Sequence, residues 1–347
     1  MKIYMAPMEG LTGYIYRNAF EKNFAKGKID KYFMPFISPN QSQKFLAKEI
    51  RDVEKENNQG IYAVPQVMTN SAKDFIWTAK MMFHEYGYDE INLNIGCPSG
   101  TVVSKFRGSG FLAVPDQLDE FLDEVMNDPF ITGADNGGKA IKVSLKTRIG
   151  KESPEEFPAL LDIFNKYKLE ELIVHPRIRT DYYRNSVNLE SFAYAVENSK
   201  NPLCYNGDIF TRTDLVAFME RFPTVDRIML GRGLIADPGF INVAAADKPK
   251  EYVRDLEADK KAMKQLHDEV YSKRCEIMSG DKHAIHRMKE MWSYMEQTFE
   301  DSKKDVKRIK KAQKMAEYQD AVNIFFGQSK LVEREYMNFN GNAGGKF

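Results

Sequence analysis

The sequence has few cysteines and tryptophans, with 3 Cys and 2 Trp among 347 residues. The cysteines stand far apart at Cys97, Cys204 and Cys275, and an odd number at wide spacing fits neither a disulfide framework nor a zinc cluster. We therefore expect three free thiols and no metal site. A lone cysteine is by default a small buried hydrophobic residue, and we assign that role to Cys204 and Cys275.

Neither sign of charge prevails, because 50 Lys plus Arg balance 50 Asp plus Glu. This balance excludes a field over the whole molecule that would attract an anionic partner, so any nucleic-acid surface has to be local. Long hydrophobic runs are also missing, and Met1–Ala6 reads as the start of a strand rather than as a signal peptide. We therefore expect a cytoplasmic protein without a membrane partner. We also expect a monomer, although nothing in the sequence itself determines the oligomeric state.

Short apolar or β-branched runs alternate with longer segments of helical periodicity as far as Phe240. The eight runs are Ile3–Ala6, Tyr32–Phe36, Ala63–Val67, Glu90–Asn94, Ala140–Leu145, Leu172–His175, Leu203–Tyr205 and Arg227–Leu230. The helical segments include Ser71–Tyr86, Pro115–Met126, Pro154–Lys166 and Thr211–Phe222. Eight strand–helix units predict a closed (β/α)8 TIM barrel. The alternative is a doubly wound open sheet, but no Gly-rich dinucleotide fingerprint follows the first strand.

The pattern changes after Asp247, where long, charged, Met-rich segments with helical periodicity run on to Phe326. The Gly- and Asn-rich end of the sequence is typical of a frayed terminus. The sequence therefore predicts a barrel over 1–245, a helical domain over 250–335 and a flexible tail over 336–347.

In a TIM barrel the active site is built at the C-terminal ends of the strands and in the loops that follow. Amide, cationic and glycine residues gather at those ends, where a hydrophobic core needs none. They are Gln66, Asn94, Lys146, His175, Asn206-Gly207-Asp208 and Gly231-Arg232-Gly233. The two glycine-bearing loops would let backbone N–H groups approach a phosphate, to which Arg232 would add a charged hydrogen bond. For either loop alone, a tight turn without a ligand is an equal alternative.

One further stretch is more specific. Asn94-x-Gly96-Cys97-Pro98, followed by Val103, Lys105 and Gly108-Ser109-Gly110, resembles the signature of the tRNA-dihydrouridine synthases. Other motifs of that family occur in the family order at the predicted strand ends. They are Ala6-Pro7-Met8 with Thr12 and Arg17, Gln66, Lys146-Thr147-Arg148-Ile149-Gly150, His175-x-Arg177-x-Arg179 with Tyr183, Asn206-Gly207-Asp208-Ile209 and Gly231-Arg232-Gly233.

The resemblance, which covers roughly residues 1 to 245, implies an FMN-dependent barrel enzyme that reduces uridines in tRNA to 5,6-dihydrouridine. It also implies NADPH as the reductant and a helical tRNA-binding domain after the barrel. The implied cofactor contacts are Pro7, Met8, Glu9, Gln66, Lys146, His175, Asn206, Gly207, Asp208, Gly231 and Arg232, of which the last five would hold the ribityl phosphate.

The resemblance gives Cys97 the role of general acid, which protonates uracil C5 when the flavin gives hydride to C6. Such a donor has to keep its proton, so the role requires an ordinary or raised pKa for Cys97. Gly96 and Pro98 fix a turn at a strand end, which favours this role over simple packing. Without the family pattern, Lys146 could also be a Schiff-base nucleophile or a phosphate ligand, and His175 a packing residue.

A base inside folded RNA cannot reach a flavin deep in a barrel, so the target nucleotide has to swing out of its stack. The substrate contacts that we expect are Asn94, Lys105, Arg107, Arg148, Arg177, Arg179 and Tyr183. In the helical part, seven cations between Lys303 and Lys314 form a run that by itself would be typical of a solvated helix face. With the barrel motifs we interpret it as a tRNA-binding face, with salt-sensitive affinity.

Several positions depart from the family pattern, among them Pro176, Ile178, Asp181 and Glu290, so the tRNA position that is reduced is not predicted. Two other hypotheses stay open. The protein could be an FMN barrel oxidoreductase that acts on a free pyrimidine or another small substrate. It could also be a noncatalytic RNA-binding protein on a degenerate barrel.

Overall fold

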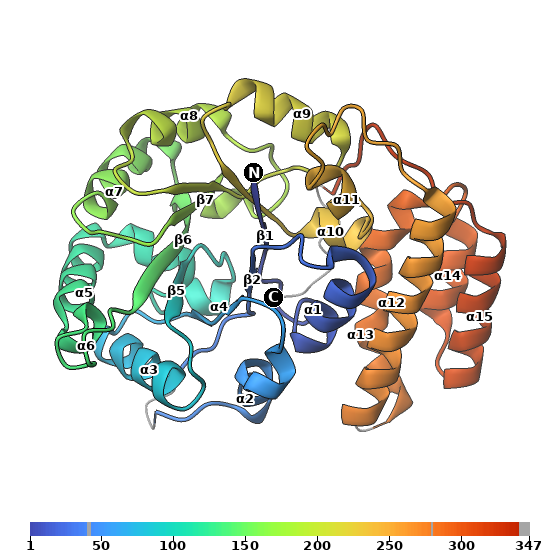
Figure 1. Ribbon diagram of the computed structural model, residues 1–347, viewed down its shortest axis with the longest axis horizontal. Coiled ribbons are helices and arrows are strands. Elements are labelled where there is room, and N and C mark those ends of the chain that lie inside the picture. Colours follow the sequence, from blue (N-terminus) through green and yellow to red (C-terminus); the bar gives the residue numbers. More distant parts are fainter. Residues whose placement is uncertain (40–42, 279, 340–347) are drawn as a thin grey trace.

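In the computed structural model, which describes residues 1–39, 43–278 and 280–339, a parallel barrel is followed by a bundle of long helices (Figure 1). The strands are β1 (Lys2–Met5), β2 (Lys31–Phe33), β3 (Ala63–Val64), β4 (Gln66–Val67), β5 (Glu90–Ile95), β6 (Lys142–Gly150), β7 (Leu172–Ile178), β8 (Leu203–Tyr205) and β9 (Arg227–Leu230). All pairings between them are parallel. The predicted TIM barrel with a C-terminal helical part is confirmed.

The ninth strand arises at Pro65, which divides the predicted third strand into β3 and β4. Proline has no N–H to give to a sheet ladder, so a strand is interrupted where it stands. β3 pairs with β2, β4 pairs with β5, and the Pro65 carbonyl accepts a hydrogen bond from the Asn92 N–H at 2.9 Å. The interrupted strand therefore has neighbours on both sides and closes the ring.

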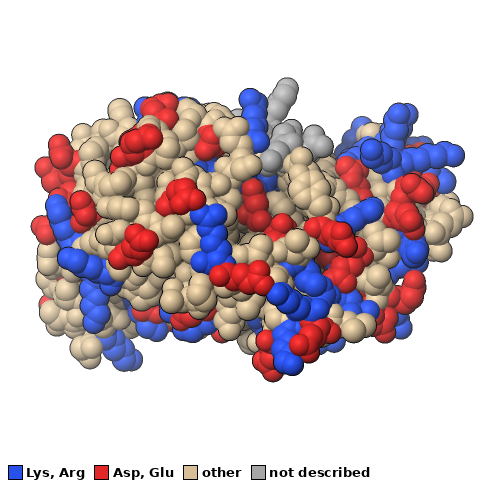
Figure 2. All heavy atoms as spheres, turned by 90° about the horizontal axis from the view of Figure 1, so that it is seen from above, with Lys and Arg blue, Asp and Glu red and all other residues tan. Residues whose placement is uncertain are grey.

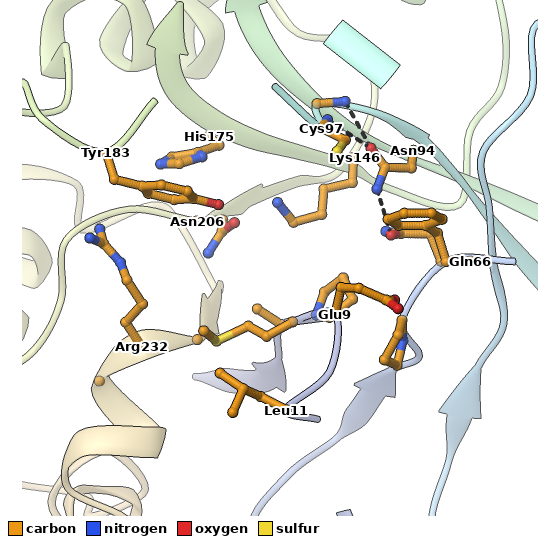
Figure 3. Close-up of a pocket in the computed structure, with 18 of the residues that line it drawn as sticks. Glu9, Leu11, Gln66, Asn94, Cys97, Lys146, His175, Tyr183, Asn206 and Arg232 are labelled. Atoms are coloured by element: carbon orange, nitrogen blue, oxygen red, sulfur yellow. Dashed lines mark hydrogen bonds between the residues drawn. The ribbon is translucent and has the colours of Figure 1, made fainter. Parts of the chain in front are cut away.

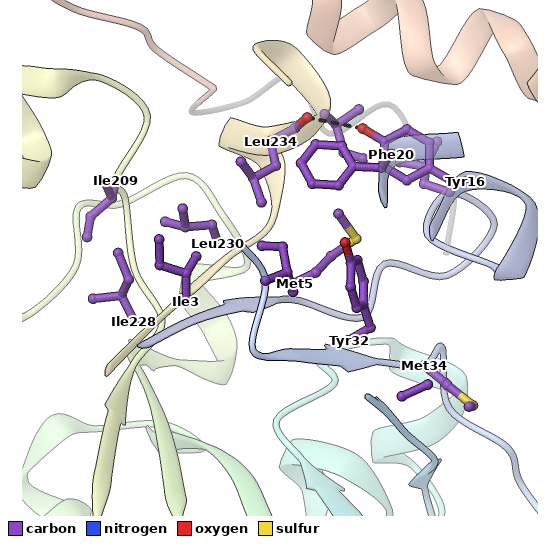
Figure 4. Close-up of a cluster of buried hydrophobic side chains, with 14 of the residues drawn as sticks. Ile3, Met5, Tyr16, Phe20, Tyr32, Met34, Ile209, Ile228, Leu230 and Leu234 are labelled. Atoms are coloured by element: carbon purple, nitrogen blue, oxygen red, sulfur yellow. Dashed lines mark hydrogen bonds between the residues drawn. The ribbon is translucent and has the colours of Figure 1, made fainter. Parts of the chain in front are cut away.

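Side chains alternate between the two faces of the barrel wall, as the pleat requires. Tyr4, Ala6, Phe33, Ile173 and Cys204 belong to a small buried cluster inside the barrel. The intervening residues face outward into the main core against the helices. Figure 4 shows this outer layer around Ile3, Met5, Tyr16, Phe20, Tyr32 and Leu230. The buried position that we expected for Cys204 is confirmed, whereas Cys275 is only half-buried.

A buried ionic cluster lies at the N-terminal ends of the strands. The Lys31 ammonium is 2.8 Å from the Glu90 carboxylate and 2.5 Å from that of Glu171, and Arg227 lies 3.5 Å from Glu171. Both carboxylates are almost completely buried, so each needs a cationic partner to keep its charge. This cluster fills the barrel at the N-terminal ends of the strands and leaves the C-terminal ends for a ligand.

Helices surround the barrel, and several begin at the residues that the sequence predicts. They are α1 (Tyr14–Phe20), α2 (Ala47–Val53), α3 (Ala72–His84), α4 (Gly100–Val103), α5 (Pro115–Asn127), α6 (Pro129–Thr132), α7 (Phe157–Phe164), α8 (Leu189–Asn198), α9 (Arg212–Arg221), α10 (Arg232–Ala236) and α11 (Phe240–Ala244). The Ser71 side chain caps α3 and that of Thr211 caps α9, by accepting hydrogen bonds from backbone N–H groups.

The helical part consists of α12 (Leu256–Ile277), α13 (Asp281–Met295), α14 (Lys303–Lys311) and α15 (Met315–Gln328). It packs on one side of the barrel, with α12 against α1 and α13 against α10 (Figure 1). The Arg274 guanidinium, on α12, donates to the Gly10 carbonyl at 3.1 Å. Of the helices in the described ranges, none is both long and apolar enough to cross a membrane.

The last described residues depart from the expected tail. Met337 and Phe339 are buried, and the Phe339 ring packs against Phe210 at 4.7 Å and Tyr294 at 5.9 Å between ring centroids. The segment up to Phe339 is thus packed between barrel and helical part. The rest of the predicted tail, residues 340–347, lies outside the described residues.

Candidate active site

A cavity opens at the C-terminal ends of the strands, with about 1150 Å³ of atom-free space that includes its mouth (Figure 3). Most of the residues that the sequence singles out meet there. Its walls include Pro7, Met8, Glu9, Gln66, Asn94, Cys97, Lys146, His175, Tyr183, Asn206, Gly207, Gly231 and Arg232. These residues come from seven strand ends, so the barrel topology brings them together from distant parts of the chain.

Amide side chains form a ladder at one end of the cavity. Gln66 Nε2 donates to Asn92 Oδ1 at 2.8 Å, and Asn94 Nδ2 donates to Gln66 Oε1 at 2.7 Å. Asn94 Oδ1 accepts from the backbone N–H groups of Gly96 and Cys97, each at 3.0 Å (Figure 3). These bonds fix which way each amide faces and anchor the start of the Cys97 loop.

Cys97 lies in a loop that folds back on itself. Both the backbone N–H and the hydroxyl of Ser109 donate to the Cys97 carbonyl, at 3.0 and 2.8 Å. Gly108 has φ +54°, and a Cβ there would lie 2.8 Å from the same carbonyl, so only glycine fits. Burial raises the pKa of the Cys97 thiol, although Arg148 and Lys146 act in the opposite direction. The thiol therefore keeps its proton at neutral pH, as an acid requires.

Lys146 and His175 share an electropositive environment. Lys146 points into the middle of the cavity (Figure 3), and burial together with the nearby Arg148 charge lowers its pKa to about 8. Burial lowers the pKa of His175 well below its usual value, and four neighbouring cations add to this effect. His175 is therefore a neutral hydrogen-bonding group, whereas Lys146 is a cation close to its titration point.

Cationic and glycine residues gather at the other end of the cavity. The Asp208 carboxylate accepts from Arg232 at 2.6 Å and also pairs with Arg177, so it orients both guanidinium groups. Arg232 Nη1 is buried and has no hydrogen-bond partner in the described part of the chain. At Gly207 a Cβ would lie 2.1 Å from the Tyr205 hydroxyl, and at Gly231 it would lie 3.2 Å from the Ala6 Cβ. A side chain at Gly207 would therefore clash with Tyr205 unless that ring moved, and at Gly231 it would be a tight contact with Ala6.

Some expected contacts do not line the cavity, and the clearest cases are two arginines that bond to other parts of the protein. Arg148 is 1% exposed and donates to the carbonyls of Gly96, Ile178 and Tyr182, at 2.9, 2.7 and 2.8 Å. Arg177 is fully buried and bonded to Asp208 and to the Asn185 carbonyl. The remaining residues outside the cavity walls are Asp208, Lys105, Arg107 and Arg179.

Sequence reasoning missed the side chains that reach the cavity from the helical part. Glu290 and Tyr294, both on α13, line the cavity, and its apolar lining also includes Leu11, Phe36 and Phe210. Nothing in the local sequence signals that α13 contributes side chains to this cavity. Within the described residues, no group of three or more His, Cys, Asp or Glu side chains is placed to hold a metal ion.

The family model described as dihydrouridine synthase matches residues 4–328. The chain belongs to the dihydrouridine synthase family. It is 30% identical to the tRNA-dihydrouridine(16) synthase of Pseudomonas putida over 73% of this chain and 76% of that protein. It is 25% identical to tRNA-dihydrouridine synthase B of Pasteurella multocida over 70% of this chain and 68% of that protein. As a member of this family, the protein is an enzyme, as we predicted from the sequence.

Proposed function

We propose that the protein reduces uridines in tRNA to 5,6-dihydrouridine, with FMN as its cofactor and NADPH as the reductant. The names of its relatives support the reaction and the tRNA substrate. The observation that carries the proposal is the meeting of a proton-holding thiol, Cys97, with a lysine and an amide ladder in one cavity. A noncatalytic role would not require these groups to converge.

The cavity has the chemistry that FMN needs at both ends. Arg232 Nη1, which has no hydrogen-bond partner among the described residues, and the side-chain-free backbone at Gly207 and Gly231 suit a phosphate. Lys146 and Gln66 would hold the polar pyrimidine edge of the ring, over the apolar surface of Pro7 and Met8, with His175 and Asn206 beside it. When bound, FMN supplies hydride transfer, from the nicotinamide cofactor to C6 of uracil.

Cys97 would supply the proton that completes the reduction. Its Sγ holds the proton until C5 of the uracil becomes basic, and its raised pKa keeps the thiol protonated while the base is bound. Asn94 holds the loop of Cys97 through two backbone N–H groups and so orients the donor. Tyr183 would pack against the substrate at the mouth of the cavity.

The helical part would hold the rest of the tRNA. In α14 the exposed side chains are cationic, and Val306 and Ile309 face the core. Figure 2 shows Lys and Arg gathered at the end of the molecule that the helical part forms. Such a patch attracts the RNA backbone even though the whole chain has no net charge. The cytoplasmic location and the monomeric state stay predictions.

The absorption spectrum of the purified protein tests the proposal directly. We expect a flavin spectrum that bleaches on anaerobic addition of NADPH and recovers when unmodified tRNA is added. Dihydrouridine should then be found in that tRNA. A colourless protein that still binds tRNA would favour the noncatalytic alternative, and recovery with free uracil alone would favour a small substrate.

A further inference from the structure

Phe106 stands at a backbone position that normally belongs to glycine. The Phe106 N–H donates to the Val103 carbonyl at 3.0 Å, and the Arg107 N–H donates to that of Val102 at 3.2 Å. This pair of bonds is the Schellman pattern that ends a helix, in which the residue at the place of Phe106 adopts the left-handed conformation. Its φ is +52°, which costs a non-glycine residue about 1 kcal/mol or more.

Burial of the phenyl ring does not offset the cost of this backbone conformation. Phe106 is 49% exposed, whereas a phenylalanine that stabilises a fold is normally buried. The residues on either side are fixed, because Asn70 Nδ2 donates to the Lys105 carbonyl at 3.2 Å and Arg107 Nη1 donates to the Ser38 hydroxyl at 3.3 Å. Neither backbone preference nor core packing explains a phenylalanine here, which leaves a role for the ring at the surface.

A shallow pocket of about 670 Å³ lies beside the ring, on the loop that carries Cys97 but outside the active-site cavity. Arg179 and Lys151 line it together with Phe106. Among the residues that the structure describes, none is a hydrogen-bond partner of the buried Arg179 Nε. Lys151 forms an ion pair at 3.3 Å with the exposed Glu152, which also lines the pocket, and a pair of this kind is weak and easily replaced.

An exposed aromatic ring next to two available cations suits a nucleotide that is not stacked in a helix. The ring offers a face to the base, and the cations offer charged donors to its phosphate. We propose that this pocket binds an unpaired nucleotide of the RNA substrate, with the base stacked on Phe106 and the phosphate held by Arg179 and Lys151. The inference rests on the proposed function, because it takes tRNA as the substrate.

The backbone conformation makes the test sharp. Phe106→Gly removes the unfavourable φ, so we expect an unchanged or higher Tm. It also removes the ring, so we expect the affinity for tRNA to fall by about 5- to 100-fold, which is the loss typical of one base–aromatic stack. Phe106→Trp should retain the affinity, whereas Phe106→Leu should lose it. Lys26→Gly is the matched control, because Lys26 has φ +47° in a loop before β2, and we expect its tRNA affinity to be unchanged.

The two hypotheses fail in different ways. If the wild-type protein neither binds tRNA nor forms dihydrouridine in it, the proposed function fails. If the wild-type protein does both and Phe106→Gly binds tRNA equally well, only the nucleotide pocket is overturned. If Phe106→Gly instead raises the NADPH concentration needed to bleach the flavin and leaves the tRNA Kd unchanged, the pocket serves the nicotinamide dinucleotide, and the assignment to RNA is wrong.

Discussion

The Arg148 Nε donates a hydrogen bond to the Gly96 carbonyl at 2.9 Å, one residue before Cys97. A second nitrogen of the same guanidinium donates to the Tyr182 carbonyl at 2.8 Å, and Tyr182 has the uncommon φ of +50°. A strained backbone persists only where its surroundings hold it in place. Arg148 therefore fixes the two loops that bear Cys97 and Tyr183 at a set separation.

Arg148→Lys keeps the charge but cannot make three hydrogen bonds in one plane. We expect kcat to fall about 100-fold, with flavin retained, because the thiol loses its position. We also expect a loss of about 2 kcal/mol or more in the free energy of unfolding, since buried carbonyls lose their donors. The salt dependence of the tRNA Kd should stay the same, because this side chain does not face the RNA. A reduced salt dependence with normal kcat would show that Arg148 binds phosphate instead.

Cys97→Ala should keep the flavin and its bleaching by NADPH, and should lose dihydrouridine formation by about 100- to 10,000-fold, as expected for a lost general acid. Burial raises the pKa of the thiol, so in the wild-type protein the proton is lost only above the usual thiol range. Product formation in single turnovers should therefore decline only on the alkaline side. Unchanged product formation by Cys97→Ala would remove the assigned role, and Cys204→Ala serves as the control.

Lys146→Met should stabilise the flavin-free protein at pH 7. The pKa of Lys146 is about 8 in the fold and about 10.4 in an unfolded chain. Between these values the unfolded state binds more protons, so wild-type stability rises with pH and the cost of the buried charge disappears. The variant should be more stable by up to about 3 kcal/mol at pH 7 and by little at pH 10, as measured by denaturant unfolding. An advantage that does not shrink with pH would contradict the charged state of Lys146.

Arg232→Met should weaken FMN binding by about 10- to 100-fold, because a desolvated donor to the phosphate is lost. Release of FMN is measured by its fluorescence during dilution. Asp208→Asn should weaken binding less, since it only loosens the orientation of the guanidinium. Arg212→Met is the control: Arg212 pairs with Glu333 at 2.7 Å on the outer surface and should leave FMN affinity unchanged.

Replacing Lys303, Lys304 and Lys307 by Gln should reduce the slope of log Kd for tRNA against log salt by about 0.7 to 0.9 for each phosphate that a lysine no longer neutralises. Bleaching of the flavin by NADPH should not change, because no RNA takes part in it. The same replacement at Lys166 and Lys250, which are paired with carboxylates on the barrel, should leave the slope as it is. Equal slopes in all variants would place the RNA elsewhere.

The sequence predicts the barrel because its apolar runs have the length and spacing of strands. The predicted strand ends are wrong where a strand continues into the active site. β6 and β7 run on to Gly150 and Ile178, beyond the expected ends, and so carry Lys146 and His175 within the ladder. The expected fifth run, which corresponds to β6, ends at the apolar Leu145 directly before Lys146. Polar side chains that face a cavity are equally compatible with the sheet, so hydrophobicity alone stops too early.

The candidate site is predictable where a reactive or polar residue stands at the end of a predicted strand, as at Cys97 and Gln66. The sequence does not show two other features of the site. A cation at a strand end can face RNA or can donate to backbone carbonyls inside the protein. The tertiary packing determines that Arg148 donates to carbonyls, and the sequence does not show this. The approach of α13, which brings Glu290 to the mouth, depends on contacts between segments far apart in the sequence.

Gly10 connects the helical part to the segment that lines the cavity. Its φ is +78°, a Cβ there would lie 2.7 Å from the Arg287 guanidinium, and its carbonyl accepts from Arg274. The preceding residues Met8 and Glu9 line the cavity. The wall of the cavity is thus tied to α12 through the Gly10 carbonyl and Arg274, so a ligand that shifts α12 also acts on the segment next to Glu9. If the proposed tRNA binds the helical part, its binding is felt at the cavity, whereas a ligand held by the barrel alone has no such link.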